Sequence, residues 1–178
     1  MKKILSAFII CFLVFWTGRI ISINQNPPIT AYYDIGDTLD CGDLEVSFIE
    51  SHLDSPEQFK ERFGVESDNS DGDHKVISIC ISANNKSDKE ADLDEIFDFL
   101  ECGFEAPMWA SAINPEATYQ INNFGEEKLA PGETRKIWYV TEIPKKLYRE
   151  SAWKHIDENQ FCYVLTLSPQ KIVVRLKV

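Results

Sequence analysis

Hydrophobic and polar residues alternate along several stretches of this chain after residue 40. In 44–48 three large apolar residues are separated by Glu45 and Ser47, and in 76–83 three isoleucines occupy every second position. A period of two places one side of a strand against a core and leaves the other side free. The pattern predicts strands at 44–48, 76–83, 134–143, 161–167 and 172–178.

One segment carries the signals of a helix instead. Ser55 can cap a helix start, Pro56 suits the first helical position, and Gln58 completes a capping box. Two phenylalanines four residues apart share a face of the following turns, and Gly64 can end the helix in the left-handed conformation. The sequence therefore predicts one short helix of about two turns after Ser55.

Three other segments have less regular patterns. Residues 92–101 place apolar residues at helical spacing, yet two phenylalanines followed by Cys102-Gly103 fit a strand that ends in a turn. Strands on both sides favour the strand, and the helix remains open. Residues 107–124, interrupted by prolines, predict short irregular strands, whereas 145–160 predict a long loop or one weak helical turn.

Turn residues separate these segments at intervals typical of a β-sandwich. Pro131-Gly132 marks a tight turn, and Ser168-Pro169-Gln170 marks a hairpin turn. About seven strands make an all-β, immunoglobulin-like two-sheet β-sandwich with one short helix the most economical interpretation. The Cys…Trp…Cys spacing of true immunoglobulin domains is missing, so the expected likeness concerns architecture only.

The N-terminal segment has the marks of an export signal or a transmembrane helix. Lys2 and Lys3 precede an apolar run over residues 4–16, in which Ser6 is the one polar residue. This run is shorter than the ~20 helical residues of a membrane span, but residues 17–23 can complete it, with Arg19 reaching the headgroups. Small residues are missing where cleavage needs them, which favours an uncleaved anchor, with a cleaved signal as the alternative.

This start divides the chain into three parts. Residues 1–23 form the signal or anchor segment, residues 24–31 a proline-containing linker, and residues 32–178 the sandwich domain. The expected localisation is the cell membrane with an extracytoplasmic domain, or the exterior if the segment is cleaved. Cys11 follows Ile10, where lipid attachment needs a small residue, so we interpret Cys11 as an apolar residue of the span.

Charge narrows the range of partners. Three of the 18 Lys and Arg lie in residues 1–23, so residues 24–178 carry 15 of them against all 29 Asp and Glu, a net charge of −14. Nucleic acids and anionic lipids bind basic patches, so we expect no nucleic-acid partner. The same charge keeps the domain soluble and off the membrane surface.

Four cysteines lie outside the N-terminal segment, and export permits disulfides among Cys41, Cys80, Cys102 and Cys162. Their spacings of 39, 22 and 60 residues match no zinc pattern, which needs close pairs. Cys80 and Cys162 are out of phase with the apolar positions of their strands, which disfavours a buried bridge between sheets. Disulfide-bonded and fully reduced states both remain open.

The sequence contains no recognisable catalytic or metal-binding motif, so we expect a protein without enzymatic activity or cofactor. The three histidines form no His-Glu-x-x-His pair, and no nucleophile elbow, phosphate loop or Cys-x-x-Cys motif occurs. The acidic loop 67–73 does not follow the EF-hand order and is typical of a solvated turn. His52 and Asp54 share one side of a strand end and predict a surface pair.

Tryptophans are the best candidates for ligand contact. Trp109 and Trp138 can stack on sugars or anchor a protein interface, although core packing is the ordinary role of such residues. Trp138 alternates with Ile137 and Tyr139, so one of the two aromatic residues in this strand faces outward.

Three segments resemble a group of uncharacterised domains from Gram-positive bacteria. They are the opening Gly42-Asp43-Leu44-Glu45-Val46, the strand end Ile79-Cys80-Ile81-Ser82-Ala83-Asn84-Asn85, and the turn Leu129-Ala130-Pro131-Gly132-Glu133 that enters Ile137-Trp138-Tyr139. The resemblance covers roughly residues 32–178. It implies an immunoglobulin-like sandwich held outside the cell by a signal, lipid or transmembrane anchor, and it implies no catalytic residues.

Together these observations favour a non-enzymatic, membrane-tethered module that binds another envelope or membrane protein. A carbohydrate- or cell-wall-binding module that uses exposed aromatics is the alternative. An exported hydrolase is a third and less favoured hypothesis, since only the folded geometry can reveal its site.

Overall fold

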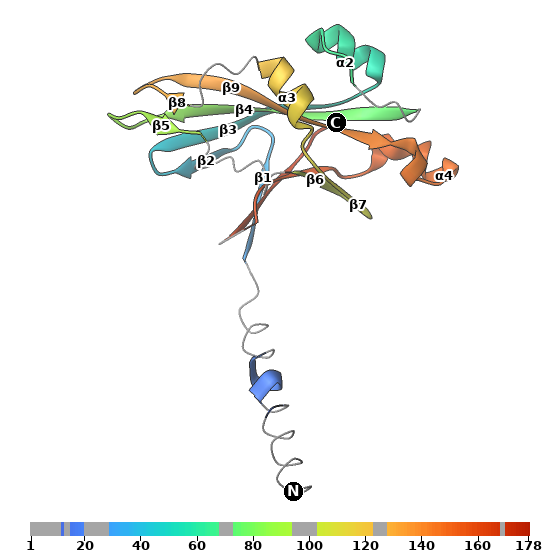
Figure 1. Ribbon diagram of the computed structural model, residues 1–178, viewed down its shortest axis with the longest axis horizontal. Coiled ribbons are helices and arrows are strands. Elements are labelled where there is room, and N and C mark those ends of the chain that lie inside the picture. Colours follow the sequence, from blue (N-terminus) through green and yellow to red (C-terminus); the bar gives the residue numbers. More distant parts are fainter. Residues whose placement is uncertain are drawn as a thin grey trace, which may run out of the picture.

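The computed structural model describes residue 12 and residues 15–19, 29–67, 73–93, 103–122, 128–167 and 170–178. These residues contain eleven strands, arranged in two large sheets and one small ribbon (Figure 1). Residues 15–19 are helical. Among the described residues, no helix is both long enough and apolar enough to cross a membrane.

The longer strands form a four-stranded antiparallel sheet, which we call sheet B. Strand β4 (His74–Asn85) pairs along its length with β3 (Leu44–Asp54) and β9 (Thr134–Pro144). Its side facing the core carries the three isoleucines of the regular sequence pattern. The spatial order is β2 (Thr38–Cys41), β3 (Leu44–Asp54), β4 (His74–Asn85) and β9 (Thr134–Pro144).

The shorter strands form a five-stranded sheet, which we call sheet A. Its order is β1 (Thr30–Asp34), β11 (Lys171–Arg175), β10 (Cys162–Thr166), β6 (Gly103–Ala106) and β7 (Trp109–Ala112). β1 runs parallel to β11, and the other neighbours are antiparallel. β5 (Ala91–Asp92) and β8 (Lys128–Leu129) form the ribbon.

One hydrophobic core lies between the two large sheets, and the fold is therefore a β-sandwich. Tyr139 of β9 stacks on Tyr163 of β10 with ring centroids 5.5 Å apart, and Phe104 of β6 meets Tyr163 edge-on at 5.1 Å. All three side chains are at most 1% exposed. Burial of each ring contributes about 2–3 kcal/mol, and because the rings come from both sheets they hold the sheets together.

Helices lie on the outer side of sheet B. α2 (Pro56–Phe63) follows β3, and α3 (Pro115–Asn122) packs along β9 (Figure 1). With sheet B they enclose a second apolar cluster of Phe59, Val76, Ala117 and Val140. Both sides of the middle of β4 are therefore buried. α4 (Glu150–Trp153) lies between the 3-10 turns η1 (Lys145–Leu147) and η2 (Ile156–Glu158). Of the two alternatives predicted for 145–160, the helical one is therefore found, with more helical turns than the single one expected.

The predicted start and end of α2 are confirmed. The Ser55 hydroxyl accepts a hydrogen bond from the Gln58 amide at 3.3 Å, and Gln58 Oε1 accepts one from the Ser55 amide at 2.8 Å. Gly64 ends the helix with φ of 70°. The tight turn before β9 is confirmed as well, because Gly132 has φ of 74° there.

Three predictions about secondary structure are wrong. The described residues contain eleven strands and not about seven, because strands of two to five residues are too short to show alternation. They also contain α3 and α4 in addition to α2. Residues 115–122, predicted as irregular strand, form α3 because Asn114 Oδ1 accepts a hydrogen bond from the Ala117 amide at 3.0 Å and Pro115 occupies the first turn.

Several predictions fall on residues outside the described ranges. They include most of residues 1–28 with Cys11, the acidic residues 68–72, and residues 94–102 with Cys102. The choice between strand and helix for 92–101 therefore stays open, except that Asp92 belongs to β5. β1 begins at Thr30, inside the segment assigned to the linker.

The capping box of α2 gives a direct test of how local signals stabilise this fold. Replacing Ser55 by Ala removes the acceptor of the Gln58 amide, so we expect a loss of about 1 kcal/mol in the free energy of unfolding. Urea denaturation of the full chain measures it. Ser151→Ala, at an exposed position of α4, is the matched control and should leave the midpoint unchanged. Equal midpoints for the two variants would contradict the role of the cap.

Candidate functional site

A β-bulge in β3 determines which side chains reach the outer side of sheet B. Phe48 is opposite Ile81 in β4 while Glu50 is opposite Cys80, so Ile49 is an extra residue. Before the bulge the even-numbered residues of β3 point into the core between the sheets; after it the odd-numbered residues do. Glu50, His52 and Asp54 therefore point outward, on the side that carries α2 and α3.

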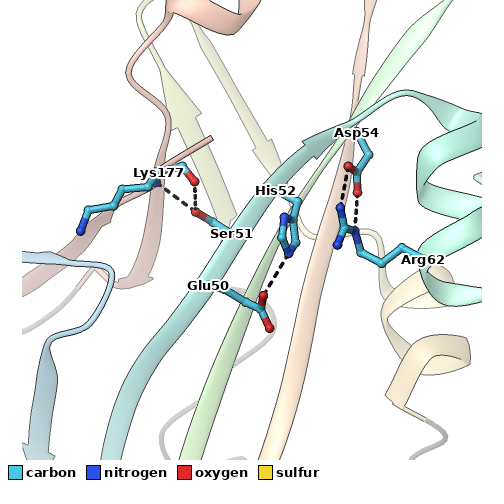
Figure 2. Close-up of polar contacts among 6 residues, drawn as sticks. All are labelled: Glu50, Ser51, His52, Asp54, Arg62 and Lys177. Atoms are coloured by element: carbon cyan, nitrogen blue, oxygen red, sulfur yellow. Dashed lines mark hydrogen bonds and ion pairs between the residues drawn. The ribbon is translucent and has the colours of Figure 1, made fainter.

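We call this outer surface the acid–aromatic face. It consists of Glu50, His52 and Asp54 of β3, Arg62 and Phe63 of α2, and Trp138 of β9. Figure 2 shows its polar contacts, and it also shows Ser51 pointing the opposite way, toward Lys177 next to the last residue of the sequence.

Two polar pairs order the acid–aromatic face. Arg62 donates two hydrogen bonds to Asp54, from Nε at 2.9 Å and from Nη2 at 3.2 Å (Figure 2). The bond to Asp54 raises the pKa of Arg62, and the side chain of Asp54 is only 8% exposed. His52 Nε2 lies 3.3 Å from Glu50 Oε2, and the Glu50 side chain is 48% exposed. Asp54 is thus satisfied within the fold, whereas Glu50 presents its carboxylate to solvent.

Aromatic rings support these polar groups. His52 stacks on Trp138 with ring centroids 5.8 Å apart and planes inclined by 22°. Phe63 of α2 meets Trp138 edge-on at 4.8 Å. Of the two aromatic residues in this strand, Tyr139 is buried in the core and Trp138 is outward and half-buried, as the alternation predicts. The rings give the face a rigid base.

α3 covers the edge of sheet B next to Trp138. The side-chain amide of Asn122 accepts a hydrogen bond from the backbone amide of Trp138 and donates one to its carbonyl, both at 2.7 Å. Asn114 N donates to the carbonyl of Val140 at 2.7 Å, and Thr118 Oγ1 accepts from Val140 N at 3.4 Å. These bonds replace a neighbouring strand and keep β9 from pairing with another chain along this stretch.

Cys80 lies beneath the face but lacks the properties of a nucleophile. It is fully buried and pairs with Glu50 on one side and Trp138 on the other. Burial, reinforced by the charge of Glu50, raises the pKa of Cys80 to about 11. Because the thiolate is the reactive form, a thiol that stays protonated at neutral pH does not make Cys80, His52 and Glu50 a catalytic triad.

A second surface lies on sheet A, at the hairpin between β6 and β7. There a hollow of about 540 Å³ is lined by side chains from four strands and the hairpin, including Tyr32, Glu105, Met108, Trp109, Gln160 and Cys162. Trp109 itself is only 8% exposed and packs edge-on against Phe161 in the core. We call this surface the hairpin hollow.

Three of the four predicted cysteines lie in the described part of the chain, and no disulfide joins them. They are Cys41, Cys80 and Cys162, which are free thiols, and Cys102 lies outside that part. Cys41 lines a separate hollow of about 480 Å³ with Asp43, Asp92, Glu90 and Lys128. No group of three or more His, Cys, Asp or Glu among the described residues is placed to hold a metal ion.

Sequence reasoning missed several residues that build these surfaces. Glu50 and Asn122 had no signal beyond composition, and Phe63 was predicted only as part of the apolar side of the helix. The break in alternation after Phe48 marks the bulge in retrospect. The surface pair expected of His52 and Asp54 is not formed, because each residue pairs with a different side chain. Trp109 and Trp138, predicted together, belong to different sheets.

Comparisons with known proteins bear on the fold. No family model matches the chain, and no curated protein matches it. The structure is similar to that of a conserved hypothetical protein from Bacillus anthracis, with a TM-score of 0.54 and 14% identity over 82% of this chain and 95% of that chain. It is also similar to an uncharacterised β-sandwich protein from Clostridium difficile, with a TM-score of 0.51 and 13% identity over 83% and 96% of the two chains. The chain thus shares a β-sandwich fold with uncharacterised proteins of Gram-positive bacteria.

The role of Asn122 predicts a measurable loss of stability. Asn122→Ala leaves the backbone amide and carbonyl of Trp138 without their partner, so we expect the free energy of unfolding to fall by about 1–3 kcal/mol. Gln120→Ala, at an exposed site on the same helix, is the control. A urea midpoint for Asn122→Ala equal to that of the control would show that α3 does not stabilise this edge.

The raised pKa of Cys80 predicts a pH dependence of stability. Between the ordinary thiol pKa of 9.0 and the folded value of about 11, the unfolded chain loses this proton while the folded chain keeps it. The contribution of the Cys80 thiol to the free energy of unfolding is therefore fully present below about pH 9 and is lost as the pH rises to about 11. Urea denaturation of the wild type and of Cys80→Ala between about pH 9 and 11 tests this prediction. The free energy of unfolding should fall more steeply with pH in the wild type than in the variant. Parallel plots of unfolding free energy against pH would refute the prediction.

Proposed function

We propose that this protein is a non-enzymatic, membrane-tethered module outside the cytoplasm, and that its acid–aromatic face binds a basic segment of an envelope or membrane protein. The observation that carries the proposal is the half-exposed carboxylate of Glu50 beside the stacked rings of His52 and Trp138. A carboxylate next to ordered aromatic rings suits a Lys or Arg side chain, whose charge pairs with the acid while its stem packs on the rings.

The electrostatics of the domain favour such a partner. Residues 24–178 carry a net charge of −14, which attracts basic segments and speeds their association. On the face itself, Arg62 is bound to Asp54, so its charge is already neutralised. Glu50 Oε2 pairs with the imidazole of His52, a group without a full positive charge when neutral, and the charge of Glu50 also acts on Arg62.

The proposed tether rests on the N-terminal apolar run. Phe12, Phe15 and Trp16 lie within it, and their side chains are 53–66% exposed. Large apolar side chains in this position are suited to a lipid environment. β1 begins at Thr30, so the domain would sit only a few residues from the bilayer.

An immunoglobulin-like relationship belongs to the same proposal. The order β11-β10-β6-β7 in sheet A is that of strands G, F, C and C′ in variable-type immunoglobulin sheets. Domains of this architecture display loops and sheet faces on a rigid sandwich, which suits an interaction module.

The alternatives have less support. A carbohydrate site needs an open aromatic face, but Trp109 is buried and Trp138 is already stacked on His52. A hydrolase needs an activated nucleophile, and the pKa of Cys80 is raised and not lowered.

Site-directed photocross-linking in the native membrane tests the proposed function. A photoreactive residue in place of Ser82, which is on the outer side of β4 near Glu50, should capture one recurrent membrane or envelope protein. The same residue in place of exposed Leu147 should not. Glu50→Gln should weaken capture on the order of tenfold, and added salt should weaken it further.

Glu45→Gln is the matched control, because Glu45 lies on the same side of β3 before the bulge. It should leave capture nearly unchanged. Equal capture from both photoreactive positions, or equal effects of the two Glu→Gln variants, would overturn the proposal.

A further inference from the structure

In the turn between β6 and β7, one residue with an apolar side chain has an unfavourable backbone conformation. Met108 has φ of 66°, and it is the one non-glycine residue with positive φ in the described part of the chain. Pro107 before it presets φ, so the pair has the dihedral signs of a type II turn, which favours Gly or Asn at the second position. Strained residues of this kind cluster at functional sites, so the position of Met108 motivates a hypothesis of function.

Met108 is also fully exposed to solvent. An unbranched thioether is flexible and adapts to irregular apolar surfaces, which makes exposed methionines effective at binding surfaces. Neither burial nor a partner within the described residues accounts for a methionine at this position. The strained turn thus presents a projecting apolar side chain.

The hairpin hollow lies directly beside this projection. Its lining residues include Tyr32, Gln160 and Cys162, and Met108 itself is at its border. Its volume of about 540 Å³ is ample for a methionine together with its turn. A projecting side chain and a hollow thus lie next to each other on one surface.

A two-fold axis requires a patch that is complementary to itself, and a projection beside a hollow is one arrangement that meets this requirement. In a symmetric dimer the same patch of both subunits forms the contact, so each projection enters the hollow of the other subunit. We infer that the hairpin hollow is the contact between two copies of this chain, with Met108 of each copy seated in the hollow of the other.

Charge identifies this patch as a place where two such acidic molecules can meet. Domains with a net charge of −14 repel each other over most of their surfaces. Around the hollow, however, Lys171 pairs with Glu105 at 2.8 Å. Arg175 pairs with Asp34 at 2.8 Å and lies over the ring of Tyr32. The charges cancel locally, so the patch is nearly neutral.

The contact is independent of the acid–aromatic face. That face is on the outer side of sheet B, whereas the hairpin hollow belongs to sheet A on the other side of the core. Dimerisation would therefore leave Glu50 and His52 accessible, and it does not depend on the proposed function.

The oligomeric state of the full chain in detergent, measured by sedimentation, tests the inference. The dimer dissociation constant should fall roughly tenfold between about 50 and about 500 mM NaCl, because salt screens the repulsion between acidic domains. The substitution Met108→Glu should raise the dimer dissociation constant roughly 30-fold or more, because it removes a central apolar anchor. Met108→Gly relieves the strained turn and removes the side chain, so it should weaken the dimer while leaving the fold intact.

Leu147→Glu, at another exposed apolar site, is the control and should dimerise like wild type. Oxidation of Met108→Cys should link two copies through Cys162, and Cys162→Ser in the same background should abolish the link. A monomer at every salt concentration, or a dimer unaffected by both Met108 variants, would overturn the inference.

Discussion

The extra residue at Ile49 is the constraint on which the rest of this structure depends. A strand has a strict two-residue period, so one inserted residue exchanges the inner and outer sides of everything that follows. Leu44, Val46 and Phe48 fill the core before the bulge. Without the insertion, Glu50, His52 and Asp54 would face that core, where unpaired charges are very costly. The bulge turns them outward and turns Ser51 inward, where its hydroxyl holds the backbone of Lys177.

The outward side of sheet B is then organised by two helices in different ways. α2 contributes side chains, since Arg62 neutralises Asp54 and Phe63 packs against Trp138. α3 contributes hydrogen bonds to the sheet edge, since Asn122 serves the backbone of Trp138 in place of a strand. An edge with no neighbour invites pairing with other chains, and α3 prevents this along β9. The acid–aromatic face is thus held from both sides, by packing on one and by backbone hydrogen bonds on the other.

The two surfaces of interest lie on opposite sheets and have opposite character. The acid–aromatic face has an exposed carboxylate on a rigid aromatic base, and the hairpin hollow is apolar with its charges paired. Their proposed contacts should respond to salt in opposite directions, because one is an attraction between unlike charges and the other must overcome repulsion between like ones. A sandwich whose core is shared by both sheets keeps the two surfaces at a constant separation, since neither sheet can move without disrupting the stacked tyrosines Tyr139 and Tyr163.

The sequence by itself determined the elements whose signals are local. The capping box at Ser55, the glycine turns at Gly64 and Gly132, and the long strands around β4 follow from neighbouring residues, and they support a β-sandwich. Strands of two to five residues show too little alternation to be recognised. The start of α3 is also a local signal, Asn114 followed by Pro115, but it was missed because Pro115 was interpreted as an interruption of a strand. The sequence indicated Trp138, His52 and Asp54 one by one, but which residues form the candidate site together was decided by tertiary structure. The site forms only after β3, β4 and β9 pair in register and α2 and α3 pack on them, which brings together Glu50, Phe63, Asn122 and Trp138. Contacts between residues tens of positions apart arise from packing and leave no pattern in the chain.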